Sequence, residues 1–184
     1  SEVVDAFEKI NQIIPISTIF SHQETGIKIT FDRDKAVTAF CKKNKIIWNE
    51  SITNGVKRGL SNRQTWRDDW CDFMDLEPFQ FQPKPNSFLP KDAFKKISSF
   101  FKLVSLTTSK NTPFQKGGTT TGMRYLKSFL QERVVNYSRH ISKPELGRLS
   151  CSRISPYIAW GNLSMRQVCQ LALEFRDQNK NVRQ

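Results

Sequence analysis

The sequence predicts a mostly helical α+β fold, in which a partial α/β layer is joined by a proline-rich linker to an all-helical segment. Three observations predict it. Apolar residues recur at helical spacing through most of the chain. Two short β-rich runs alternate with helical segments near the start, which is typical of a parallel α/β layer. Four prolines then fall between residues 76 and 90, where they forbid a helix: Pro78, Pro83, Pro85 and Pro90.

The first part of the chain alternates helices with strands. Its predicted elements are a helix over 3–14, a strand over 16–22, a helix over 32–44, a buried strand over 46–48 and a helix over 62–75. Pro15 ends the first helix because proline cannot continue one. We place Trp66 and Trp70 in the core rather than in an electron relay. Two strands do not make a stable sheet, so we expect further strands outside this sequence.

The second part is predicted to be helical. The predicted elements are a helix over 93–104 with Phe94 facing inward, a helix over 120–139, a loop holding Pro144 and Gly147, a short helix from Ser155 to about Gly161, and a helix over 164–177. Met123, Leu126, Leu130, Val134 and Tyr137 form one apolar stripe on the long helix. These elements indicate a first domain over 1–75, a linker over 76–112 and a second domain over 113–184.

The charge of the chain points to a polyanionic partner. Lysine and arginine total 29 against 17 acidic residues, a formal net charge of +12. Nucleic acid is the commonest such partner, and an anionic membrane surface is the alternative. No apolar run approaches the roughly 20 residues that span a bilayer. The four cysteines form no CxxC pair, which favours reduced thiols, a cytoplasmic location and no metal site.

The segment from Cys151 to Tyr157 carries the chemistry. Short polar side chains and an arginine precede a predicted helix start, where free N–H groups, hydroxyls and a guanidinium suit a phosphate or pyrophosphate. Serine followed by proline is also an ordinary helix cap. From these residues alone, both interpretations stay open.

A longer pattern surrounds this segment. It consists of Phe114, Gly117 and Gly118, a helix ending in Tyr137, then Pro144, then SRISPYIAWGNLSMRQV over 152–168. This order and spacing resemble the start of the flavin-binding domain of the DNA photolyase/cryptochrome family, whose pattern runs approximately F-x-G-G, helix, Y, P, [TS]-S-x-L-S-P-Y-L. Upstream, FSHQETG, RDKAV and RQTWRDDW resemble the end of that family's α/β antenna domain.

The resemblance implies flavin adenine dinucleotide (FAD) as cofactor, with its phosphates on the loop 151–155. It assigns cofactor contacts to Tyr137, Cys151, Ser152, Arg153, Ile154 and Ser155. Tyr137 is otherwise a core aromatic, and Cys151 stands where the family has Thr or Ser, so its thiol is a poorer donor. The resemblance further assigns DNA contacts to Arg139 first and Lys143 second, against ordinary solvated charge.

Other family positions carry weaker implications. We expect Trp160 to pack in the core, and Arg166 and Gln167 to hold neighbouring helices together. The antenna chromophore stays open, because Ile29 and Thr30 stand where polar folate ligands are expected. The resemblance assigns no catalytic residue within this sequence.

The implied function is blue-light-driven repair of pyrimidine dimers in ultraviolet-damaged DNA, with the cross-linked pyrimidine dimer flipped out of the duplex toward the flavin. The alternatives are a cryptochrome-type photoreceptor without repair activity and a cofactor-free, basic DNA-binding helical module. We expect the sequence to be a piece of a longer protein, inactive alone, whose missing parts come from the remainder of that protein or from self-association.

Overall fold

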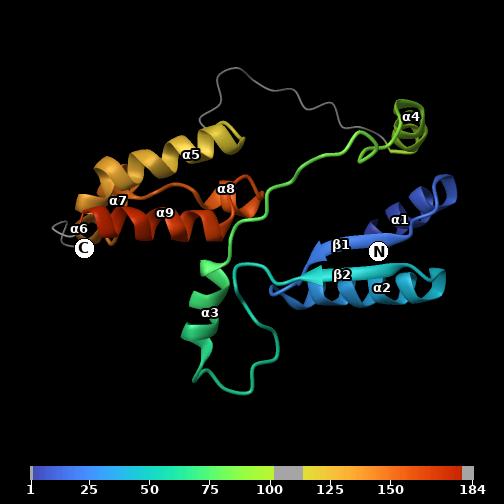
Figure 1. Ribbon diagram of the computed structural model, residues 1–184, viewed down its shortest axis with the longest axis horizontal. Helices are drawn as coiled ribbons and strands as arrows, with labels where there is room; N and C mark the ends of the chain where they lie inside the picture. Colours follow the sequence, from blue (N-terminus) through green and yellow to red (C-terminus); the bar gives the residue numbers. More distant parts are fainter. Residues whose placement is uncertain (1, 102–113, 180–184) are drawn as a thin grey trace. The chain divides into compact units, whose positions relative to one another are not determined.

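The computed structural model describes residues 2–101 and 114–179 (Figure 1). The chain divides into two compact units. The first comprises residues 1–62 and 80–108, and the second comprises residues 63–79 and 109–184, each with its own core. Each unit is described below by itself.

The first unit is a small α/β layer. Its elements are α1 (Glu2–Ile13), β1 (Thr18–His22), α2 (Lys28–Asn44), β2 (Ile47–Ser51) and α4 (Lys91–Ser99). Strands β1 and β2 pair in parallel, with Thr18 opposite Ile47 and His22 opposite Ser51. Helix α2 connects them and lies along the sheet, as the crossover of a parallel pair requires (Figure 1).

Apolar side chains from α1, α2 and the strands close the core of this unit. Val37, Phe40 and Cys41 of α2 are buried together with Ile46, and Phe7 of α1 stacks on Phe40 at 6.1 Å between ring centroids. Lys45 ends α2 in the left-handed conformation, at φ 56°. The predicted parallel α/β layer is therefore present.

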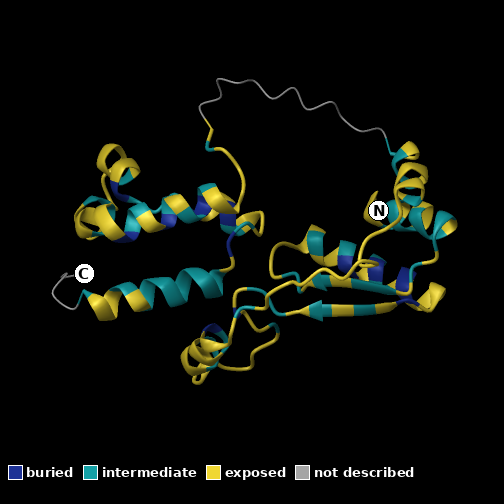
Figure 2. Ribbon diagram, turned by 45° about the horizontal axis from the view of Figure 1, so that its top comes forward, coloured by how far each residue is buried: buried dark blue, intermediate teal, exposed yellow. Residues whose placement is uncertain are grey.

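The second unit is helical. Its elements are α3 (Trp66–Asp75), α5 (Thr119–Ser128), a π-helical turn η1 (Phe129–Arg133), a 3-10 turn η2 (Val134–Asn136), α6 (Tyr137–His140), α7 (Pro144–Ser150), α8 (Ser155–Ala159) and α9 (Met165–Gln178). The core gathers Leu126, Leu130, Ile154, Tyr157 and Leu163. One face of α9 packs on this core, which is why most of α9 is half-buried (Figure 2).

Polar contacts attach α3 to α9. Arg166 Nε donates to the Phe73 carbonyl at 3.0 Å, and its guanidinium lies 4.5 Å from the centroid of the Phe73 ring. Gln170 Nε2 donates to the carbonyls of Met74 and Leu76 at 2.8 and 3.0 Å. The prediction that Arg166 joins neighbouring helices is confirmed. Gln167, in contrast, caps its own helix.

The structure confirms a mostly helical α+β chain and corrects several predicted boundaries. Helix α2 begins at Lys28, four residues before the predicted start, and α3 begins at Trp66 rather than 62. Helix α4 ends at Ser99, and the predicted end at 104 lies outside the described residues. The predicted loop around Pro144 is instead helix α7, with proline in its first turn, where a missing N–H costs nothing.

Burial corrects four further predictions. Ile47 in the predicted buried strand is 60% exposed, since β2 has no neighbour beyond β1 in the described sheet. Phe94, predicted to face inward on α4, is 63% exposed. Trp66 and Trp160, predicted to lie in the core, are 47% and 84% exposed. Helical spacing marks an apolar face, but only a packed neighbour can bury it.

Candidate anion-binding site

The loop 151–155 runs from the end of α7 to the start of α8. Cys151 caps α7 in an extended conformation, and Arg153 takes the left-handed conformation at φ 59°. A positive φ is uncommon for any residue other than glycine and is found mainly where the surroundings hold the chain in place. The loop is therefore held by contacts from outside itself.

Two side chains supply those contacts. Arg133, the last residue of the π-helical turn, donates from Nη1 to the carbonyl of Cys151. Gln115 donates from Nε2 to the carbonyl of Arg153 at 2.9 Å. Two carbonyls of the loop are thus anchored by residues 18 and 38 positions away in the sequence.

The loop borders an open cleft of about 460 Å³. Its lining residues are Phe114, Gln115, Arg148 and Arg153. The lining residues therefore include two arginines and a glutamine but no carboxylate. Guanidiniums are donors only and match phosphate oxygens in pairs, so the cleft is suited to a phosphate or pyrophosphate.

Within the loop, the side chains divide between the core and the solvent. Ile154 is buried at 7% exposure and belongs to the hydrophobic core. Ser152 is half-buried and Ser155 is exposed, and neither hydroxyl has a hydrogen-bond partner in the part of the chain that the structure describes. The Arg153 guanidinium lies over the ring of Tyr125, 5.4 Å from its centroid. Ile154 can therefore offer a ligand only its backbone, whereas the serines can offer hydroxyls.

Ser155 does not cap helix α8. The N-cap position is Ile154, and no side-chain cap bond forms there. Helix α8 spans 5 residues, so its dipole is small. The start of α8 is therefore a weaker anion site than the sequence indicated, and the cleft beside the loop is the stronger candidate.

Tyr137 opens α6 and is 36% exposed. Its ring meets Phe129 edge-on, with 5.6 Å between centroids and an interplanar angle of 87°. The hydroxyl end of a half-exposed tyrosine stays accessible while the ring packs. This placement is compatible with both interpretations of Tyr137, as ligand and as packed aromatic.

The two candidate DNA contacts lie close together along the chain. Arg139 is in α6, Lys143 is the residue before α7, and both are exposed. Between these helices, His140 Nδ1 lies 2.6 Å from Ser150 Oγ, which is buried at 5% exposure. That contact joins α6 to α7, the helices that contain or adjoin Arg139 and Lys143.

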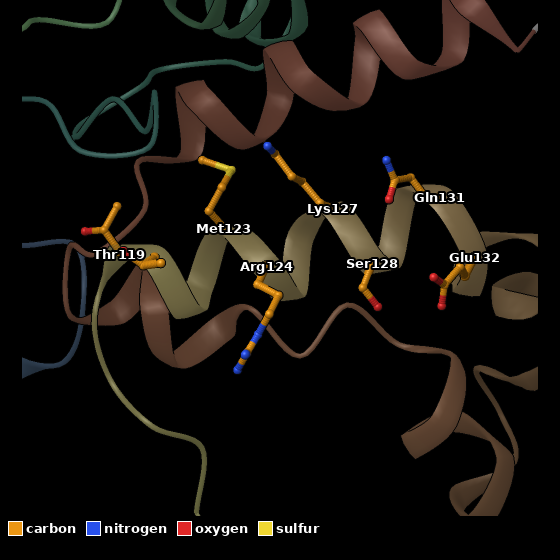
Figure 3. A pocket seen from close by; sticks show the side chains of 8 residues that line it. Thr119, Met123, Arg124, Lys127, Ser128, Gln131 and Glu132 are labelled. Carbon is orange, nitrogen blue, oxygen red and sulfur yellow. The ribbon is translucent and has the colours of Figure 1, made fainter.

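A second hollow, of about 570 Å³, lies along α5 and η1 (Figure 3). Met123, Lys127 and Gln131 project from one side of the helix, and Arg124, Ser128 and Glu132 project from the other. All its lining residues come from one continuous helical segment, from Thr119 to Glu132. A ligand there would be enclosed on one side only, so this groove is a weaker candidate than the cleft beside the loop.

Sequence reasoning missed Arg133, Gln115 and Arg148. Arg133 stood three residues after Leu130 on the apolar stripe of the long helix, where an arginine must either leave the core or find acceptors. That position was a usable signal. Gln115 and Arg148 carried none, because an amide or an arginine in a polar segment is ordinary.

No metal site or membrane span is found in the described residues. Within 2–101 and 114–179, no group of three or more His, Cys, Asp or Glu side chains could hold a metal ion. No helix in the same residues combines the length and apolar character that crossing a bilayer requires. The four cysteines are all free.

Comparison with known proteins adds no assignment. No protein-family model matches this sequence, and no curated protein matches it. The resemblance carried by residues 114–168 therefore enters below as the basis of a proposal.

Proposed function

We propose that this chain is part of a flavin-dependent, blue-light-driven DNA photolyase, and that the loop 151–155 binds the phosphates of FAD. The observation that carries the proposal is the cleft beside the loop, whose lining includes Arg148, Arg153 and Gln115. A dinucleotide needs such a set of donors at its pyrophosphate, where its negative charge is concentrated.

The residues present fit the phosphate part of this cofactor. The cleft volume of about 460 Å³ falls within the roughly 300–1,000 Å³ of small-molecule pockets. No acidic side chain lines it. The hydroxyls of Ser152 and Ser155, which have no partner among residues 2–101 and 114–179, add donors on the same loop that the family resemblance assigns to the phosphates.

In this proposal the flavin and the protein chain have different roles. When bound, a flavin supplies the light-driven electron transfer. This chain supplies binding and orientation: the guanidiniums of Arg148 and Arg153 neutralise phosphate charge, and the loop serines orient the phosphate oxygens. We assign contacts with the backbone of damaged DNA to the exposed cations Arg139 and Lys143, an assignment that the net charge of +12 supports.

FAD binding is tested first. Because the resemblance leaves the rest of the flavin pocket outside this sequence, we expect the 184-residue chain alone to bind FAD weakly, seen as a small rise in its melting temperature at high FAD concentration. Arg153→Gln and Ser152→Ala should each weaken binding, since they remove donors at the cleft. Ser142→Ala changes an exposed serine outside the loop and is the matched control. Equal affinity in all four proteins would contradict the proposed site.

DNA repair is tested next, with an ultraviolet-irradiated oligonucleotide containing a pyrimidine dimer. We expect dimer loss under blue light with reduced FAD in the longer protein that contains this chain, and none in the dark, whereas the 184-residue chain alone should be inactive. FAD binding without dimer loss would favour the cryptochrome-type photoreceptor. Salt-sensitive DNA binding that ignores both damage and FAD would favour the basic DNA-binding module, which the net charge supports independently.

A further inference from the structure

Arg133 makes an unusual set of contacts for a residue that does not line the cleft. Its Nη1 donates to the Cys151 carbonyl, its Nη2 to the Tyr125 carbonyl at 2.7 Å, and its Nε to Ser128 Oγ at 3.2 Å. All three guanidinium nitrogens are engaged, two of them by backbone carbonyls. The side chain is half-buried, and its guanidinium carbon also lies 6.0 and 5.9 Å from the ring centroids of Tyr125 and Phe129.

The local helix geometry explains how Arg133 reaches the loop. Residues 129–133 form a π-helical turn between α5 and the 3-10 turn η2. A π turn shifts the phase of the side chains that follow, and such turns often occur at functional sites. Here the shift ends at Arg133, which contacts both α5 and the loop.

The contact with Cys151 has a directional consequence. In a trans peptide the C=O and the following N–H point in opposite directions, and the described chain contains no cis peptide. When Arg133 holds the Cys151 carbonyl, the N–H of Ser152 must point away from Arg133. Gln115 does the same for the Arg153 carbonyl and the N–H of Ile154.

We propose that Arg133 is a positioning residue of the anion-binding loop, which sets the direction of the Ser152 amide without touching the anion. The inference rests on the proposed phosphate-binding function of the loop. Arg133 is absent from the lining of the cleft, whereas Arg148 and Arg153 belong to it. Its role is therefore separable from theirs by experiment.

The test follows backbone amide resonances of the ¹⁵N-labelled chain while inorganic pyrophosphate is added at several salt concentrations. Wild type is compared with Arg133→Gln, Arg133→Lys and the direct-contact variant Arg153→Gln. Arg133→Lys keeps the positive charge but has a single donor nitrogen, which cannot bond all three partners of the guanidinium. It also provides a test if Arg133→Gln fails to fold. Partners that orient ligand-contacting groups change affinity about 10–100-fold in metal sites, so we expect roughly tenfold weaker pyrophosphate binding by the folded Arg133 variants.

Two further readouts separate positioning from general structural support. Without pyrophosphate, Arg133→Gln should shift the Ser152 and Arg153 amide resonances more than those of α9. The salt dependence of binding should stay at the wild-type slope in Arg133→Lys and fall in Arg153→Gln, because Arg153 belongs to the lining of the cleft and Arg133 does not.

The outcomes distinguish this inference from the proposed function. If wild type binds pyrophosphate and both folded Arg133 variants bind it equally well, Arg133 is not a positioning residue, while the proposed function stands. If wild type shows no saturable shifts, the phosphate site itself is wrong, and the role of Arg133 falls with it.

Discussion

Tyr157 shows how tightly single residues fit in the second unit. It is 2% exposed, its hydroxyl donates to the Lys116 carbonyl at 2.7 Å, and its ring lies against Gly122 of α5. A Cβ built on Gly122 would lie 2.9 Å from Tyr157 Cγ and 3.2 Å from Leu163 Cδ1. Glycine in a helix interior is normally a cost, so its presence here reflects the closeness of the tyrosine ring.

Gly122→Ala is therefore expected to destabilise the chain, although alanine is the better helix former. Overpacking a closely packed core costs about 1–3 kcal/mol, which exceeds the gain of up to about 1 kcal/mol in helix propensity. Urea unfolding measures the change. Gly117→Ala is the matched control, since nothing lies within 4 Å of a Cβ there. A Gly122→Ala variant as stable as the control would show that the ring can move aside.

The cysteines should differ in reactivity according to burial. Cys41 is 3% exposed, and burial raises the pKa of its thiol, whereas Cys71 is exposed. Because the thiolate is the reacting species, we expect iodoacetamide to modify Cys71 first and Cys41 last in the native protein. Peptide mass spectrometry over time gives the order, and denatured protein should show no such order. Early modification of Cys41 would mean that the first core opens readily.

The pKa of Cys41 also sets the sign of a pH effect. Its folded pKa lies above the ordinary value of 9.0, so folding favours the protonated thiol. That contribution to the free energy of unfolding is present below pH 9.0 and is lost as the pH rises through the folded pKa. Cys41→Ser, measured from pH 8 to 10, should lose this alkaline dependence.

At the scale of elements, α9 is a helix whose first turn is closed by side-chain hydrogen bonds. Ser164 Oγ accepts from the Gln167 N–H at 3.0 Å, and Ser164 N donates to Gln167 Oε1 at 3.1 Å, which completes a capping box. Helix α8 has no side-chain cap, although its Ser-Pro start looked like one in the sequence. A cap needs the side chain to turn back on the first turn, and residue type alone does not ensure that.

Ser164→Ala and Ser155→Ala should therefore have different effects. Loss of a serine N-cap costs about 1 kcal/mol, so we expect Ser164→Ala to lower the free energy of unfolding by roughly that amount. Ser155→Ala should change it by less than about 0.5 kcal/mol, because its hydroxyl has no partner in the described chain. Urea denaturation of both variants measures the two changes in the free energy of unfolding. Equal changes would contradict the assignment of Ser164 as the cap.

At the scale of the molecule, the chain has two cores that share no residue. One gathers around Phe40 and the other around Tyr157. Helix α3, which the sequence placed in the first domain, belongs to the second compact unit through its contacts with α9. Large apolar side chains stay exposed in the segment 79–90, including Phe79 at 88% and Phe88 at 69% (Figure 2).

Two separate cores predict two unfolding transitions. Two-state behaviour is expected of single domains, and it fails when cores lose structure independently. Hydrogen exchange along a urea series, read on peptides around Phe40 and around Leu126, should give different midpoints. One coincident midpoint for both peptides would show that the two units unfold together.

Local chemistry determined much of this structure. Periodic apolar residues predicted α1, α2, α9 and one helix over 120–139, which the structure divides into α5, η1, η2 and α6, and the β-rich runs predicted both strands. These elements follow from backbone preferences and from the spacing of apolar residues, which are properties of neighbouring residues in the chain. The residues of the loop 151–155 also drew attention to it, because its short polar side chains and arginine are adjacent in the sequence, but they left the anion site and the helix cap as open alternatives.

Only the tertiary structure decided which residues surround that loop and which apolar faces are covered. Arg133 and Gln115 reach its carbonyls from 18 and 38 positions away, through contacts that no short window of sequence contains. Trp160 stays exposed for the same reason, since burial depends on a partner surface rather than on side-chain type. Local propensities are set along the chain, whereas hydrogen-bond partners and burial are set by packing across it.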